Sequence, residues 1–326
     1  MRVRPTRAQV EGVRRSAQKL ARRTVSVSYR SIVVPLLGRA ETAHALDLAC
    51  RLAGARGSTV LLVAPLIVPN ELPLDAHFDD EVAELERQLA EAAEIAKAHG
   101  VGAKPRVIRT RAGALGRELA AFAHDYRAQL LVVGAPVESR RGFRRPFPQD
   151  VFTIVRDAPC RVLIVSGRVV PAAGEAFVLR RILVPVKLGP IGTEMLMSAI
   201  RLAAEQNATV EVLCVLPVPL DVPVDTELPE LEERAAAALA EAALLGAGQG
   251  VEVLGHIVRA RSIGSAIADV ARETHADLIV LGSSPRWRRE PRFFSPTVEY
   301  VLRHAPTEVM VVAFPEGALG ATLGPR

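Results

Sequence analysis

Short apolar runs of strand length alternate with amphipathic segments of helical period along residues 31–166. The predicted strands are rich in Val, Ile and Leu and cover residues 31–36, 59–64, 106–110, 129–134 and 161–166. The predicted helices between them cover residues 41–53, 79–99, 115–126 and 152–156. Continuous apolar strands between amphipathic helices predict a parallel sheet with both faces covered. Such a sheet binds ligands outside the carboxyl ends of its strands, near the topological switch point.

The longest predicted helix covers residues 79–99 and begins with three acidic residues, which suit a helix N-terminus. Its large apolar residues recur at intervals that are typical of one helical face. We therefore expect one buried stripe, which consists of Val82, Leu85, Leu89 and Ile95.

The second half of the chain repeats the first half. Residues 32–36 (Ile-Val-Val-Pro-Leu) return as residues 182–186 (Ile-Leu-Val-Pro-Val), 150 positions later. Small loop deletions reduce this offset to 147 near the end of the repeat. A register held over so long a stretch indicates a duplication. The expected parts are a basic tail (1–28), a first domain (29–166), a linker (167–179), a second domain (180–315) and a C-terminal tail (316–326).

The composition restricts the fold class, and the positions of the charged residues show where the positive charge lies. Aromatic residues make up 4% of the 326 residues and apolar residues 49%, so the core must be aliphatic, as suits helix-covered parallel strands. Residues 1–28 contain eight Lys or Arg residues and one Glu, whereas the whole chain has a net charge of only +5. The rest of the chain contains 33 basic and 35 acidic residues, a net charge of −2. The basicity therefore belongs to the tail.

The basic tail has two competing interpretations. Val10, Val13, Ala17 and Leu20 share one helical face, so the tail can form a basic amphipathic helix on an anionic lipid surface or beside a membrane transporter. The alternative is a disordered, solubilising tail, because the apolar side lacks Trp and Phe. Nucleic acid is not an expected partner, since neither base-stacking aromatic residues nor a recognised motif accompanies the charge.

Cysteine usage and hydropathy indicate the compartment. No apolar run approaches the ~18 residues that span a bilayer, and the N-terminus lacks the apolar core of a secretory signal. Cys50, Cys160 and Cys214 lie far apart in apolar segments and form neither a disulfide framework nor a metal-ligand spacing. The seven histidines also lack metal-ligand spacing. We expect a cytoplasmic protein without a metal, which the tail could bring to the inner face of the membrane.

Several segments resemble the universal stress protein family. In the second repeat they are residues 182–186, residues 277–283 (Asp-Leu-Ile-Val-Leu-Gly-Ser) and residues 301–306 (Val-Leu-Arg-His-Ala-Pro). In the first repeat they are residues 130–134 and residues 157–162 (Asp-Ala-Pro-Cys-Arg-Val). The resemblance covers about residues 30–166 and 180–314, and residues 221–261 look closest to the stress-protein domains attached to amino-acid permeases.

This resemblance implies a specific fold class. It implies two tandem Rossmann-like domains of the adenine nucleotide alpha hydrolase type, each with a five-stranded parallel sheet. It also implies that the two domains pair through their last strands into an intrachain pseudo-dimer. A homo-oligomer is a further expectation.

The resemblance also identifies a nucleotide motif, which is degenerate here. ATP-binding members have an Asp after the first strand, and a glycine-rich loop after the fourth strand whose N–H groups close on phosphates. Leu37 and Lys187 hold the Asp position in the two repeats. The first glycine of the loop is retained as Gly134 and Gly282, which could instead serve only to turn the chain out of a strand.

The later positions of the motif differ between the repeats. The second glycine has become Val137 and Pro285, and the third has become Pro148 and Ser295. Proline donates no N–H, so the usual phosphate cradle cannot form. The second repeat retains more hydroxyl donors, so ATP or another adenine nucleotide stays a candidate cofactor there.

Arginines occur where the glycines of the motif are missing, and they suggest a different way of binding an anion. Both repeats carry arginines after the fourth strand, and an Arg-x-Arg pair ends each third strand. We hypothesise that guanidinium groups hold an anionic ligand, whereas the alternative is solvated arginines paired with acids such as Glu138 or Glu290. The candidate ligand-binding residues are Lys187, Arg259, Arg261, Gly282, Ser283, Arg286, Ser295 and Thr297, with Leu37, Arg109, Arg111 and Gly134 as weaker counterparts in the first repeat.

These observations favour a regulatory or sensor protein of the stress response that binds a nucleotide or another anionic small ligand. An enzyme is not expected, because the sequence has no nucleophile elbow, P-loop or dinucleotide fingerprint. One alternative is an adaptor that binds no ligand and acts on a membrane transporter or membrane surface through its basic tail. A weak ATPase is a third alternative.

Overall fold

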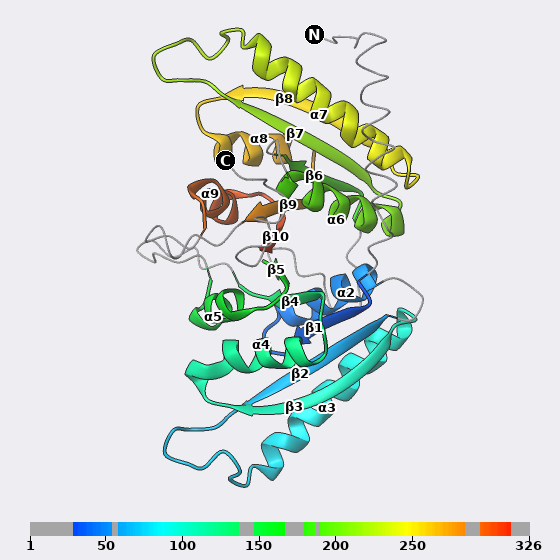
Figure 1. Cartoon of the computed structure of the whole chain (residues 1–326), viewed down its shortest axis with the longest axis vertical. Helices are drawn as coiled ribbons and strands as arrows, with labels where there is room; N and C mark the ends of the chain where they lie inside the picture. The colour runs from blue at the N-terminus through cyan, green and yellow to red at the C-terminus, as the bar shows by residue number, and fades with distance from the viewer. Residues whose placement is uncertain are drawn as a thin grey trace, which may run out of the picture. The chain divides into compact units, whose positions relative to one another are not determined.

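The computed structural model describes residues 29–53, 58–136, 147–166, 179–186, 190–283 and 294–313. These residues form two compact units (Figure 1). One unit contains residues 179–280, and the other contains residues 29–166 together with residues 281–313. The end of the second repeat therefore groups with the first repeat.

The first repeat alternates strands and helices as predicted. Its elements are β1 (Ser31–Pro35), α2 (Glu41–Ala53), β2 (Thr59–Ile67), α3 (Asp79–Ala98), β3 (Gly102–Thr110), the 3-10 helix η1 (Ala112–Ala114), α4 (Leu115–Asp125), β4 (Leu130–Gly134), α5 (Gln149–Asp157) and β5 (Arg161–Val165). The strands lie in the order β3-β2-β1-β4-β5, and every pair is parallel. The chain reverses its direction of winding between β1 and β4, which is the topological switch point.

The second repeat follows the same order of elements. They are β6 (Arg181–Pro185), α6 (Pro190–Gln206), β7 (Thr209–Pro217), α7 (Pro229–Ala247), β8 (Val253–Ala260), α8 (Ile263–Glu273), β9 (Leu278–Ser283), α9 (Pro296–His304) and β10 (Glu308–Ala313). In this repeat β9, β6, β7 and β8 lie side by side with parallel pairing. The predicted duplication is therefore a duplication of the fold.

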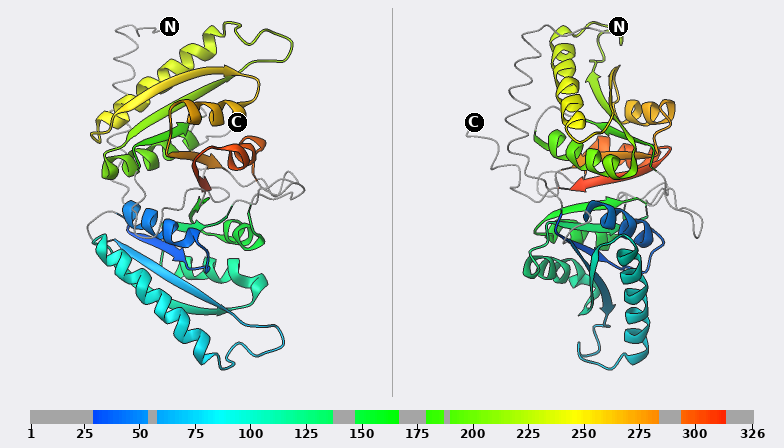
Figure 2. Two further views of the ribbon diagram at one scale, coloured as in Figure 1. Left: turned by 180° about the vertical axis from the view of Figure 1, so that it is seen from behind. Right: turned by 90° about the vertical axis from the view of Figure 1, so that its right-hand side faces the viewer.

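Helices cover both faces of the sheet in the first repeat. Figure 2 shows α3 on one face of the strands and α4 on the other. The strands between them are aliphatic, and the side chains of Ile32, Val33 and Leu131 are completely buried. This confirms the predicted α/β architecture with an aliphatic core.

The last strands of the two repeats pair with each other. Strand β10 runs antiparallel to β5, with Val311 opposite Ile164 and Ala313 opposite Val162. Phe147 and Phe294, which are separated by the same offset of 147 residues, lie just before α5 and α9 and pack edge to face with ring centroids 6.0 Å apart. The implied pairing through the last strands is thus present.

Strand β3 and helix α3 are only partly buried, and one residue of the predicted buried stripe of α3 is exposed. Strand β3 is mostly exposed, because it is the terminal strand of its sheet and has one neighbour. In α3 the buried residues are Leu89, Ala92 and Ala96, whereas Ile95 is 40% exposed. Ile95 lies six residues after Leu89, which places it well away from that face of the helix.

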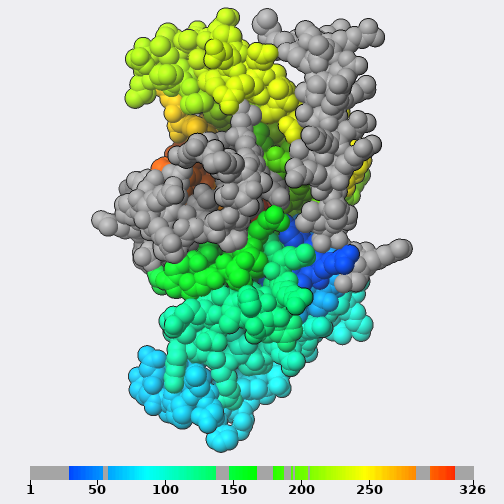
Figure 3. Space-filling view, viewed as in Figure 1, coloured from blue at the N-terminus to red at the C-terminus, as the bar shows by residue number. Residues whose placement is uncertain are grey.

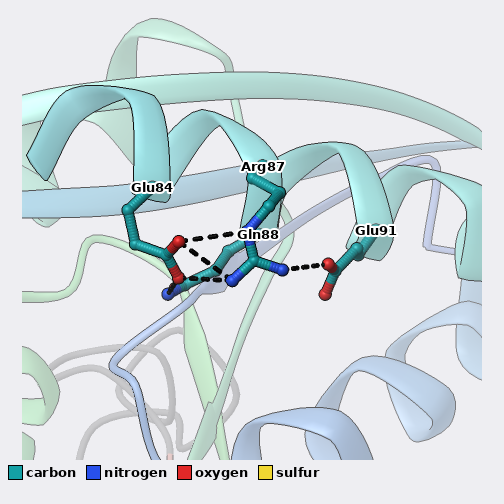
Figure 4. A network of polar contacts seen from close by, with 4 residues as sticks. All are labelled: Glu84, Arg87, Gln88 and Glu91. Atoms are coloured by element: carbon teal, nitrogen blue, oxygen red, sulfur yellow. Dashed lines mark hydrogen bonds and ion pairs between the residues drawn. The ribbon is translucent and has the colours of Figure 1, made fainter. Parts of the chain in front are cut away.

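The opposite face of α3 carries a polar network on the solvent side. Arg87 donates to Glu84 and Glu91, and Gln88 donates to the same Glu84 carboxylate (Figure 4). The Arg87 hydrogen bond lowers the pKa of Glu84 below its ordinary value. Such exposed pairs at helical spacing support the helix and indicate an ordinary solvated face.

Candidate ligand-binding site

The carboxyl ends of β1 and β4 meet at the switch point of the first repeat, where an α/β sheet of this kind takes its ligand. Gly134 ends β4 there and lies against the start of α2. A Cβ on Gly134 would lie 2.4 Å from the carbonyl oxygen of Glu41 and 2.8 Å from the nitrogen of Thr42. Gly134 is therefore required by the close approach of two backbone segments.

An arginine and an aspartate form an ion pair between the loop before α2 and the first turn of α5. Arg39, in the loop between β1 and α2, donates to the carboxylate of Asp150 in the first turn of α5. The same carboxylate accepts from the backbone N–H of Val151 at 3.0 Å. The ion pair thus connects the loop after β1 to the start of α5.

Two polar atoms of this cluster are buried without a hydrogen-bond partner among the described residues. They are Nη1 of Arg39 and Oγ1 of Thr42. Thr42 is the second residue of α2, and its backbone N–H donates to the Arg39 carbonyl at 3.0 Å. A buried guanidinium nitrogen and a buried hydroxyl normally bind a protein group, a water molecule or a ligand. Their position at the switch point makes this cluster the candidate site of the first repeat.

The two arginines that end β3 hold a loop of their own repeat. Arg109 donates to the carbonyls of Leu74 and Ala76, at 3.1 and 2.6 Å. Arg111 donates to the carbonyls of Pro69 and Leu72. These carbonyls belong to the loop between β2 and α3, which forms the light-blue end of the first repeat in Figure 3. The sequence placed both guanidinium groups at the ligand crevice, whereas the structure gives them backbone partners in this loop.

Of the matching arginines in the second repeat, Arg261 keeps an equivalent backbone partner, and Arg259 has a different one. Arg259 forms an ion pair with Glu232 in the first turn of α7, and Arg261 donates to the carbonyl of Val222 at 3.1 Å. The Arg259 hydrogen bond, together with the N–H of Leu228, lowers the pKa of the Glu232 carboxyl group. Arg111 and Arg261 thus hold equivalent carbonyls, since Leu72 and Val222 are 150 residues apart, as the two arginines are.

The other predicted residues of the second repeat lie at the ends of β9 and α9. Gly282 and Ser283 end β9, and Ser283 is 5% exposed. The hydroxyl oxygen of Ser295 accepts from the N–H of Val298 and caps the N-terminus of α9. Thr297 lies in the first turn of that helix. Lys187 and Arg286 lie outside the described residues.

Both repeats match one known protein family. A family profile described as "Universal stress protein family" matches residues 28–166 and 179–313, which is most of the sequence. The chain belongs to the universal stress protein family. Both repeats are members, so the tandem arrangement implied by the sequence is confirmed.

The chain is also similar to individual proteins, and the solved structures among them show the same fold. A universal stress protein of Mycobacterium tuberculosis is 31% identical over 130 residues, which cover 38% of this chain and 44% of the relative. The chain thus spans less than half the length of that curated relative in the match. A solved universal stress protein from Archaeoglobus fulgidus superimposes with a TM-score of 0.61 at 16% identity, covering 88% of this chain and 97% of the other. A structure from Pseudomonas aeruginosa gives a TM-score of 0.57 at 18% identity.

Sequence reasoning missed three residues of the candidate site in this universal stress protein: Arg39, Thr42 and Asp150. The offset of 147 pairs Asp150 with Thr297, so one repeat has a carboxylate where the other has a hydroxyl. That difference was readable from the alignment of the two repeats. The ion pair with Arg39 was not readable, because the two residues are 111 positions apart in the sequence and no motif connects them.

The cysteines contribute no chemistry to the site. Cys50, Cys160 and Cys214 are buried and not bonded to one another. Burial raises the pKa of Cys160 and of Cys214 to about 11, so both are protonated at neutral pH. Within the described part of the chain, no group of three or more His, Cys, Asp or Glu residues could hold a metal ion. The same part contains no helix long and apolar enough to cross a membrane.

Proposed function

We propose that this universal stress protein is a regulatory protein that binds an anionic small ligand, a nucleotide in the first instance, without turning it over. The observation that carries the proposal is the pair of buried polar atoms, Arg39 Nη1 and Thr42 Oγ1, at the switch point of the first repeat. A guanidinium nitrogen and a hydroxyl beside a close-packed glycine suit a phosphate or carboxylate oxygen.

The second repeat offers a different set of groups for the same class of ligand. Thr297 replaces Asp150, so its hydroxyl brings no negative charge to the start of α9. Ser283 and Ser295 add two further hydroxyl groups, although that of Ser295 already caps its helix. We therefore infer that the second repeat binds the anion more tightly than the first.

Calorimetry on the full chain tests this function. ATP, a cyclic mononucleotide and a cyclic dinucleotide are each titrated at up to millimolar concentration, and the products are analysed by chromatography. Binding without product supports the proposal, and Thr297→Val should then weaken the tighter of the two sites. Absence of heat with all three ligands rejects ligand binding, and formation of product would make the protein an enzyme.

The Arg39–Asp150 ion pair yields a specific prediction for the first repeat. The Asp150 carboxylate competes with an incoming anion for the Arg39 guanidinium, so Asp150→Asn should tighten ATP binding at that site. A neutral amide in place of the charged partner is expected to change the dissociation constant about tenfold. The measurement is the calorimetric isotherm of the variant against that of the wild type.

Asp157→Asn is the matched control for this experiment. Asp157 ends α5 and pairs with its neighbour Arg156, away from the cluster at the start of the helix. Its substitution should leave ATP affinity unchanged. Equal affinities of Asp150→Asn and the wild type would show that Arg39 does not contact the ligand.

A second role is proposed for the tail, on the strength of its charge alone. Eight Lys or Arg residues within residues 1–28 can attract an anionic lipid surface, each contributing about 1 kcal/mol when close to it. The full chain should float with vesicles that contain phosphatidylserine, whereas a chain without residues 1–28 should not. Vesicles of neutral lipid are the control, and equal flotation of the two proteins would reject this role.

A further inference from the structure

The edge strands of the two repeats, β3 and β8, differ in the residues at their corresponding positions. Strand β3 pairs with β2 and strand β8 pairs with β7, and neither has a second neighbour among the described residues. The offset of 150 aligns them residue by residue. Lys104, Pro105 and Arg106 of β3 correspond to Leu254, Gly255 and His256 of β8.

The hydrogen bonds of the ladders show which backbone groups face outward. The carbonyls of Glu252 and Ala260 accept from β7, and the N–H of Gly102 and the carbonyl of Thr110 bond to the β2 side. Successive residues of a strand direct their N–H and C=O to alternate sides. Residues 253, 255, 257 and 259 therefore present theirs to the open edge of β8, and residues 103, 105, 107 and 109 do so on β3.

This parity explains the proline in β3. Pro105 stands at an outward position, where its missing N–H costs the sheet nothing and removes a donor from the open edge. Lys104 and Arg106 flank it with charge. Charge and proline are the devices by which natural sheets prevent an edge from pairing with another chain.

Strand β8 has lost all three of these protections. Gly255 restores the outward N–H, and residues 253–258 contain no Lys, Arg, Asp or Glu. Leu254 and Ile257 are 43% and 41% exposed. His256, the titratable side chain of the segment, contacts the buried Glu211 of β7 at 2.7 Å. An open backbone edge flanked by exposed apolar side chains is suited to receive another strand.

We propose that the edge of β8 is a docking surface for β8 of a second copy of this chain, which pairs with it antiparallel about a two-fold axis. An exact two-fold axis normal to the sheet places residues of equal parity opposite one another, so an axis at Gly255 sets Val253 opposite Ile257 of the second copy. The strand carries no charge between residues 253 and 258, so self-pairing brings no like charges together. The same pairing through β3 would place Lys104 and Arg106 opposite one another and leave Pro105 without a bond.

Gly255→Pro tests the backbone edge directly in the full chain, and Gly255→Ala is its control. A Cβ on Gly255 would lie 2.9 Å from a methyl carbon of Leu239 in either variant, so the comparison separates the effect of this contact from the loss of the outward N–H and the addition of the proline ring. Sedimentation velocity between ~1 and ~100 µM should show a dimer for the wild type and for Gly255→Ala. The dissociation constant of Gly255→Pro should rise at least about a hundredfold.

A second variant keeps the test valid if proline disturbs the strand. Leu254→Lys with Ile257→Lys changes two exposed side chains and places like charges at the paired edge, so the thermal transition should persist while the dimer dissociates. A wild type that is monomeric at ~100 µM overturns the proposal. So does a dimer that survives both the proline and the lysine variants, since it must then use another surface. These outcomes are independent of ligand binding.

Discussion

Replacing Gly134 by alanine is expected to destabilise the unit of residues 29–166 and 281–313 by about 3 kcal/mol or more. The added Cβ would lie 2.4 and 2.5 Å from the carbonyl oxygen and carbon of Glu41, and both are backbone atoms. No rotamer change can relieve such a contact, so either β4 or the start of α2 must move. Thermal and urea unfolding of the full chain measure the effect.

Gly113→Ala is the matched control for that substitution. Its Cβ would have no heavy atom within 4 Å, and the position has no positive φ angle. Its effect should stay within about 0.5 kcal/mol of the wild type. If Gly134→Ala is equally mild, the close approach of α2 is not what requires glycine at this position. The backbone contact between β4 and α2 would then not be the rigid feature on which the candidate site depends.

Much of the fold was predictable because the same order of strands and helices occurs twice in the sequence. Helix α2 covers the predicted residues 41–53, and the strands β1 and β4 end within one residue of their predicted ends. Strands β2 and β3 extend further than predicted, to residues 59–67 and 102–110. Pro65 and Pro105 interrupt the apolar pattern within these two strands, and the backbone pairing continues through both prolines.

The candidate site was less predictable, for a physical reason. Arginines at the end of a strand were assigned to the ligand by charge, but Arg109 and Arg111 bind carbonyls in the loop between β2 and α3. A sequence shows that a guanidinium group is present, but it does not show which acceptor the group binds. The Arg39 and Asp150 pair shows the converse, since neither residue belongs to a recognisable motif.

Substituting Ser166 by alanine should weaken the junction of β5 and β10. The Ser166 hydroxyl donates to the carboxylate of Glu308, which is completely buried, and accepts from the N–H of Val309 at 3.0 Å. Alanine removes one partner from each of these buried groups. Buried charged and backbone groups that lose a hydrogen bond are costly, so we expect a loss of about 2–3 kcal/mol.

Hydrogen exchange of the β10 amides, together with thermal unfolding, measures this second effect. Ser31→Ala is the control, because the Ser31 hydroxyl donates a long hydrogen bond to the Tyr126 carbonyl, at 3.4 Å, and its loss should cost less than about 1 kcal/mol. Glu308→Gln keeps an acceptor for Ser166 and should protect β10 better than Ser166→Ala does. If Ser166→Ala leaves exchange in β10 unchanged, the antiparallel strand pairing alone holds the two repeats at this junction, and the buried hydroxyl is dispensable.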